Sequence, residues 1–194
     1  MQQKKKKKHG QNQTFPALLY KKILDQWTQK KPVVFFILGF AVLIGVFYWF
    51  YESSYYTNIG SFIISVDSHI SNVILNLLGQ KTQVTGPVIS SSLFSISIAR
   101  GCDAIEGMAL FSAALLAYPA RWKYKLYGFL AGNAILFLLN LVRIITLFLT
   151  GIYAPKLFQI MHIEIWEALF ILFALTLWIL WIRWTFKAKA HVPN

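Results

Sequence analysis

Three side chains in the sequence have the chemistry of a catalytic set: a thiol, a guanidinium and an imidazole, each beside a different hydrophobic segment. Cys102 is the only cysteine among 194 residues and stands at the head of an apolar stretch that runs to Tyr118. Arg143 lies inside a second apolar stretch, and His162 directly precedes a third. A free thiol is mostly protonated at neutral pH, and a neighbouring cation or imidazole favours the attacking thiolate. These residue types therefore suit nucleophilic acyl transfer.

Each of the three residues has a definite role in such a reaction. His162 would accept the thiol proton and later protonate the leaving amine. Arg143 would stabilise the thiolate or the oxyanion of the tetrahedral intermediate. An arginine inside a span costs at least about 2.5 to 3.5 kcal/mol on insertion scales, so it usually marks a functional site. The alternatives are a cysteine that fills apolar space, an interfacial histidine and an arginine that extends to the membrane surface.

The composition is that of a membrane protein. Hydrophobic residues make up 57% of the chain and charged residues only 13%, whereas soluble domains carry about 25% charged residues. The net charge of +12 comes from lysines and arginines beside hydrophobic segments, where they set membrane topology and do not indicate a nucleic-acid partner. A single cysteine excludes an intramolecular disulfide, a CxxC redox pair and a thiolate zinc cluster.

The hydrophobic segments predict an all-α integral membrane protein, a bundle of about four transmembrane helices. The predicted spans are 33–51, 103–118, 126–151 and 163–184. Before them, residues 1–14 are predicted to be a disordered basic tail, because five consecutive lysines cannot bury a core. Helical spacing with a basic polar face predicts an interfacial helix over residues 15–31 on the cytoplasmic membrane surface. Residues 32–190 form a single membrane domain in this interpretation.

Residues 52–100 are the only sizeable segment that the pattern places outside the bilayer. Apolar residues at helical spacing predict an amphipathic helix over 61–78. Strict alternation over 94–98, after a Gly86-Pro87 turn signal, predicts a short strand or hairpin that leads to Cys102. The charged residues Glu52, Asp67 and Lys81 receive no role here beyond solvation. The prediction is a small extracytoplasmic helix-plus-hairpin segment.

Lysine and arginine counts orient the predicted spans. Fifteen lysines and arginines lie before the first span, in the loop 121–125 or at the C-terminus. Only three lie in the two segments that the alternation of spans places on the opposite side of the membrane: Lys81, Arg100 and Lys156. By the positive-inside rule, both termini are cytoplasmic. A helix rises about 1.5 Å per residue, so the height of each reactive residue above the cytoplasmic basic residues can be estimated. The heights are roughly 28 Å for Cys102, 27 Å for Arg143 and 31 Å for His162. All three therefore fall at the outer edge of a hydrocarbon core about 30 Å thick.

Polar residues near this depth add support. Asn133, Asn140 and Arg143 are spaced to share one side of a helix, which suggests a face turned toward protein. Glu106 follows Cys102 by four residues, so a helix would place both on one face, where Glu106 would pair with Arg143 or hold His162. The alternative for Asp103 and Glu106 is favourable negative charge in the first turn of a helix.

The ordered set of motifs resembles the exosortase/archaeosortase family over residues 85–180. The resemblance rests on Gly101-Cys102-Asp103 at the head of a span, Asn140-Leu141-Val142-Arg143 in the next and Met161-His162-Ile163 at the start of the following one. Many members have Cys-Ser-Gly or Cys-Thr-Gly where this chain has Cys102-Asp103-Ala104. The chain also has fewer predicted spans than the larger members.

The resemblance implies a polytopic cysteine peptidase or transpeptidase of the prokaryotic plasma membrane, with its active site on the extracytoplasmic side. Cys102 would be the nucleophile, and Arg143 and His162 would complete the catalytic set without a cofactor. Asn140, Glu106 and Asp103 are the expected supporting residues. The implied partners are the lipid bilayer and exported proteins whose C-terminal sorting tail contains a short motif, a transmembrane helix and a basic cluster. The acceptor of the acyl group is not implied.

Two other functions fit the residues less well. The chain would be a non-enzymatic assembly or transport subunit if Arg143 paired with Glu106 only for structure. A metal site would use His162 with Asp103, Glu106 or Glu164, but the sequence contains no HExxH or comparable ligand spacing. The sequence analysis therefore predicts a thiol enzyme with no metal.

Overall fold

The computed structural model describes residues 15–190, and most of them are helical. The predicted tail at 1–14 lies outside the described residues. Helix α1 runs without a break from Phe15 to Tyr51 and has Pro32 inside it. It therefore joins the segment predicted as an interfacial helix, 15–31, to the first predicted span. The location of 15–31 on the membrane surface stays a prediction.

Within residues 15–190, three helical segments are long and apolar enough to cross a membrane: Trp27–Tyr51, Trp122–Tyr153 and Pro155–Ala188. The first belongs to α1 and the second is helix α4. The third contains α5 (Pro155–Ile160), a π-helical turn η1 (Met161–Ile165) and most of α6 (Trp166–Ala190). The chain is thus a mostly helical, multi-pass membrane protein.

The fourth predicted span, 103–118, corresponds to a shorter helix. Helix α3 covers Ile105–Ala117, a length of 13 residues. At 1.5 Å per residue it extends about 20 Å, less than a hydrocarbon core of about 30 Å. A count of four full spans therefore stays a prediction.

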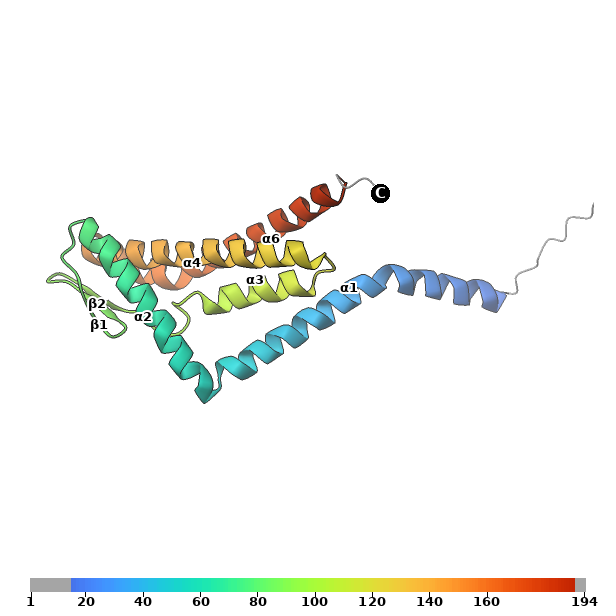
Figure 1. Ribbon diagram of the computed structural model, residues 1–194, viewed down its shortest axis with the longest axis horizontal. Helices are drawn as coiled ribbons and strands as arrows, with labels where there is room; N and C mark the ends of the chain where they lie inside the picture. Colours follow the sequence, from blue (N-terminus) through green and yellow to red (C-terminus); the bar gives the residue numbers. More distant parts are fainter. Residues whose placement is uncertain (1–14, 191–194) are drawn as a thin grey trace, which may run out of the picture.

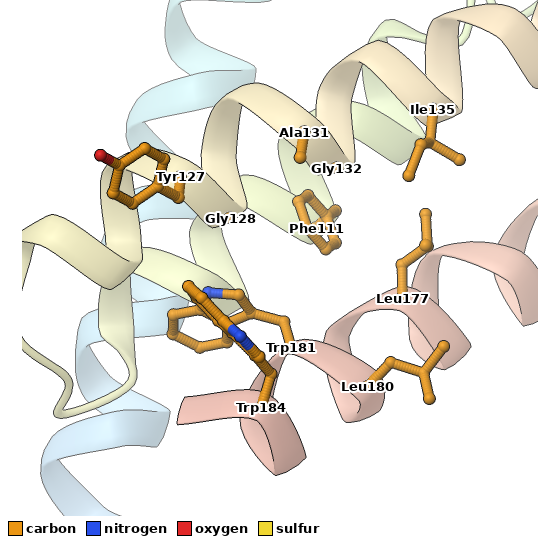
Figure 2. Close-up of a pocket in the computed structure, with 10 residues that line it drawn as sticks. All are labelled: Phe111, Tyr127, Gly128, Ala131, Gly132, Ile135, Leu177, Leu180, Trp181 and Trp184. Carbon is orange, nitrogen blue, oxygen red and sulfur yellow. The ribbon is translucent and has the colours of Figure 1, made fainter. Parts of the chain in front are cut away.

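Large side chains on one helix pack over glycines on another in the bundle. The ring of Phe111 in α3 lies where a Cβ on Gly132 of α4 would stand. The indole of Trp181 in α6 covers Gly128 in the same way, and its Nε1 donates to the carbonyl oxygen of Tyr124 at 2.9 Å. These contacts border an apolar cavity between α4 and α6 (Figure 2). The missing Cβ atoms let α3, α4 and α6 approach closely.

The segment 52–100 contains helix α2 and a small antiparallel sheet. Helix α2 runs from Ser54 to Leu77. The strands are β1 (Gln83–Thr85), β2 (Val88–Ser90) and β3 (Ser95–Ser97), in the order β1-β2-β3. The predicted helix over 61–78 thus begins earlier, and the predicted strand or hairpin is part of a three-stranded sheet.

The sheet and α2 lie at one end of α3 and α4 (Figure 1). A hydrophobic cluster fixes them there, since Leu75 of α2 and Ile89 of β2 are fully buried together with Phe148 of α4. At this end α3 begins and α4 ends. The chain therefore passes directly from β3 into the turn that precedes α3, which contains Cys102.

Candidate functional site

Cys102 lies in a tight turn before α3. The backbone is left-handed at Gly101, with φ 84°, and at Ala104, with φ 60°. Asp103 holds the start of the helix, because its Oδ1 accepts a hydrogen bond from the backbone N–H of Ile105 at 3.3 Å. The thiol therefore projects from a fixed turn and not from the side of a helix.

The predicted meeting of the three reactive side chains is observed. His162 Nε2 lies 3.1 Å from Cys102 Sγ. Arg143 Nη2 lies 4.0 Å from the same sulfur, and Arg143 Nη1 donates to the carbonyl oxygen of Gly101 at 3.4 Å. The three residues come from the turn, from η1 and from α4, so tertiary packing alone brings them together. Their catalytic roles stay a prediction.

His162 is positioned by the π-helical turn η1. The wider turn is a local departure from α-helix, and such turns occur often at functional sites. The imidazole stacks on the ring of Phe158, with ring centroids 5.7 Å apart and an interplanar angle of 21°. This contact restrains the imidazole plane and leaves Nε2 directed at the sulfur.

Arg143 is buried, with 7% of its surface exposed. Two of its guanidinium nitrogens are directed at the turn around Cys102. Its Nε has no hydrogen-bond partner among the described residues. A buried guanidinium with spare donors is suited to bind negative charge that develops on a substrate.

The thiol faces a cavity of about 340 Å³. One wall is formed by consecutive residues 94–98, which include β3, and the other carries the reactive side chains. The apolar lining includes Phe94, Leu147 and Phe158. The apolar cavity in Figure 2 is larger, but no thiol, imidazole or guanidinium lines it. The smaller cavity is therefore the candidate active site.

The model of the transmembrane exosortase family matches residues 27–182, which is most of the chain. The chain belongs to the exosortase family. No curated protein and no solved structure gave a significant match. Membership implies, in general terms, a membrane peptidase or transpeptidase.

Two of the expected supporting residues of this exosortase, Asn140 and Asp103, lie outside the cavity at the thiol. Asn140 is fully buried and donates from Nδ2 to Asp67 Oδ2 at 3.1 Å. Asp103 is 2% exposed, and its Oδ2 accepts a hydrogen bond from the hydroxyl of Tyr56 at 3.4 Å. Neither residue is among those that line the cavity at the thiol. Both are held in buried hydrogen bonds outside that cavity, and their supporting role stays a prediction.

Glu106 does not make the contacts expected of it. The prediction that it shares a helix face with Cys102 is wrong, because α3 begins at Ile105 and the cysteine precedes it. Within residues 15–190, no hydrogen bond or ion pair joins Glu106 to Arg143 or His162. Glu106 instead lines a separate cavity, which also borders Arg143 and Glu167. The structural Arg143–Glu106 pair of the non-enzymatic alternative is thus not formed.

Sequence reasoning missed Asp67, which it assigned to solvation. Asp67 is fully buried in α2, and its Oδ1 has no partner among the residues described. The buried face of the helix also contains Ser68, Ser71 and Leu75. One signal was available, because Asp67 precedes Ile70 by three positions and Ile74 by seven. That spacing places a carboxylate within an apolar stripe, where solvation is not expected.

Asp67 should make the stability of the exosortase depend on pH. The pKa of Asp67 is raised to about 7: burial raises it most, the negative charge of Asp103 also raises it, and the hydrogen bond from Asn140 lowers it. A folded-state pKa above the unfolded value of about 4 means that the native protein binds more protons between these values. This stabilising contribution is therefore complete below about pH 4 and is lost as the pH rises through about 7.

We expect the thermal unfolding temperature in detergent to fall between pH 5 and pH 8, and to fall less in Asp67→Asn. Some dependence should remain, because burial also raises the pKa of Asp103. Glu52→Gln, at an exposed position, is the control. If the unfolding temperature of Asp67→Asn depended on pH as strongly as that of the wild type, Asp67 would not be the group whose protonation stabilises the fold.

Proposed function

We propose that this chain is a cysteine peptidase or transpeptidase that removes C-terminal sorting tails from exported proteins at the outer face of the plasma membrane. The observation that carries the proposal is the 3.1 Å contact between Cys102 Sγ and His162 Nε2, with Arg143 beside the same sulfur. A cation and a base at one thiol form an activated nucleophile.

The proposed reaction begins with proton transfer from Cys102 Sγ to unprotonated His162 Nε2. The thiolate attacks the carbonyl carbon of the scissile bond, and the carbonyl oxygen takes the negative charge. The guanidinium of Arg143, which lines the same cavity as the thiol, stabilises this oxyanion. The carbon–nitrogen bond then breaks, and His162 returns the proton to the departing amine.

Two products follow from this step. The tail leaves with a new amino terminus, and the remainder of the substrate is held on Cys102 as a thioester. Water, an amine or a hydroxyl group then attacks the thioester carbonyl, and the thiol is regenerated. With the N-in and C-in orientation inferred from the basic loops, the substrate's own transmembrane helix would lie beside the bundle and its basic end would stay cytoplasmic.

The test compares C-terminal peptides of exported proteins from cells that carry the wild-type chain or Cys102→Ala, measured by mass spectrometry. We expect a set of proteins to keep a hydrophobic, basic-ended tail only in the Cys102→Ala cells. Thr57→Ala, at an exposed position of α2, is the control and should process normally. Unchanged C-termini in cells whose Cys102→Ala protein is folded and in the membrane would support a non-enzymatic subunit. The wild-type termini would also identify the acceptor.

A further inference from the structure

Strand β3 has one free edge, and residues of this strand line the candidate active site. The sheet order β1-β2-β3 leaves β3 paired only with β2. Residues 94–98 line the same cavity as Cys102, Arg143 and His162. An unpaired strand edge is a template for another extended chain.

The register shows which backbone groups are free. Ile98 N–H donates to Pro87 C=O at 2.9 Å, and Ser91 N–H donates to Phe94 C=O at 2.8 Å. In an antiparallel pair, residues alternate between those bonded to the partner strand and those directed away from it. Phe94, Ile96 and Ile98 therefore face β2, and the N–H and C=O groups of Ser95 and Ser97 point outward.

No element of the described chain uses these outward groups. Apart from the ladder to β2, no backbone hydrogen bond involves Ser95 or Ser97 within residues 15–190. Both residues are exposed, whereas Ile98 is only 2% exposed because it is part of the core. The edge thus presents two donors and two acceptors on residues that line the same cavity as the thiol.

We propose that the substrate binds as an added strand on the free edge of β3, through the backbone groups of Ser95 and Ser97. This inference rests on the proposed function and defines how that site recognises its substrate. The ligand is an extended peptide segment adjoining the scissile bond. Backbone bonds of this kind give affinity, and pockets for alternate side chains give specificity. The apolar wall of Phe94, Leu147 and Phe158 selects for an apolar side chain on one face of the peptide.

Proline substitution tests the added strand without breaking the existing sheet. Ser97→Pro removes an N–H that points away from β2, which an edge strand tolerates. We expect tail processing to fall at least tenfold in Ser97→Pro and in Ser95→Pro. Ser97→Ala, which keeps the N–H, should process at least tenfold faster than Ser97→Pro. Continued maleimide labelling of Cys102, the only thiol of the chain, shows that the turn is intact.

The opposite edge of the sheet provides the matched control. The pairs Gln83–Ser90 and Thr85–Val88 bond β1 to β2, so the N–H of Val84 faces outward on β1. Val84→Pro removes an equivalent edge donor at a position that does not line the cavity. This variant should retain tail processing.

Cross-linking gives a second readout that does not depend on proline. The double variant Cys102→Ala, Ser97→Cys is combined with a series of substrates. Each substrate carries a single cysteine, at successive positions up to the cleavage point. A paired strand predicts disulfide formation at alternate positions, because side chains of a strand alternate between faces. If Cys102→Ala leaves all C-termini unchanged, the proposed function fails. A second outcome excludes only the binding of substrate as an added strand. In that outcome the Cys102→Ala cells retain tails, the proline variants process tails normally, and the cross-links do not alternate along the substrate.

Discussion

Replacing His162 with alanine is expected to slow tail removal by about 10²- to 10⁴-fold, the usual contribution of a positioned general base. The physical reason is the 3.1 Å contact from His162 Nε2 to Cys102 Sγ. Without the imidazole, the thiol proton has no acceptor at the site and the departing amine has no donor. The measurement is the rate of tail release from a substrate identified by its C-terminal peptides.

Alkylation provides an independent readout of the same prediction. Iodoacetamide reacts with the thiolate, and Cys102 is the only cysteine in the chain. The rate of labelling at neutral pH should therefore fall in His162→Ala. His69→Ala is the matched control, because His69 is exposed on α2. Equal rates of release and labelling in the two variants would show that His162 is not the base.

Replacing Arg143 with glutamine is expected to lower kcat by about 10²- to 10³-fold, as measured for the loss of one oxyanion donor. Arg143 Nη1 binds the Gly101 carbonyl oxygen while Nη2 approaches the sulfur, so one rigid fork contacts two points of the turn. A lysine keeps the charge but not the fork. Arg143→Lys should thus recover only part of the lost rate.

Separate measurement of kcat and KM shows whether Arg143 stabilises the oxyanion or binds the substrate. Stabilisation of an oxyanion appears mainly in kcat, because the charge exists only after attack. Arg121→Gln, at an exposed position before α4, is the control for loss of positive charge. Full activity in Arg143→Lys would show that charge alone is sufficient. Full activity in Arg143→Gln would remove the residue from the mechanism.

The common level of the three reactive side chains could be predicted from the sequence, because helix rise is constant and each was measured from a basic loop. That reasoning placed the thiol, guanidinium and imidazole at one level, and their contacts are observed. The rotation of each helix about its own axis and the geometry of the turn before α3 could not be predicted from helix rise. The left-handed backbone at Gly101 and Ala104 moves Cys102 off the helix, and this conformation left no periodic signal.

Other differences have equally local causes. The interfacial helix and the first span were predicted as separate elements, yet α1 continues through Pro32 between them, as membrane helices tolerate when neighbouring groups satisfy the freed carbonyl. The apolar stripe predicted on α2 is partly exposed, since Phe62, Val73 and Leu77 are 69%, 58% and 82% exposed. The helix instead buries a small, polar face around Asp67. The apolar residues alone therefore did not indicate the buried face, and the position of Asp67 among them was the one available signal.

In the proposed reaction, and with α3 as one of the predicted spans, the short length of α3 would affect the competition between acceptors. The helix spans about 20 Å, so it leaves about 10 Å of a typical core unmatched. Either the membrane thins around it or the turn with Cys102 is recessed below the lipid surface. The proposed thioester, if recessed, would be shielded from bulk water and would persist until an acceptor reached it. Hydrophobic thickness would then influence whether the acyl group is transferred or hydrolysed, through the geometry of one short helix.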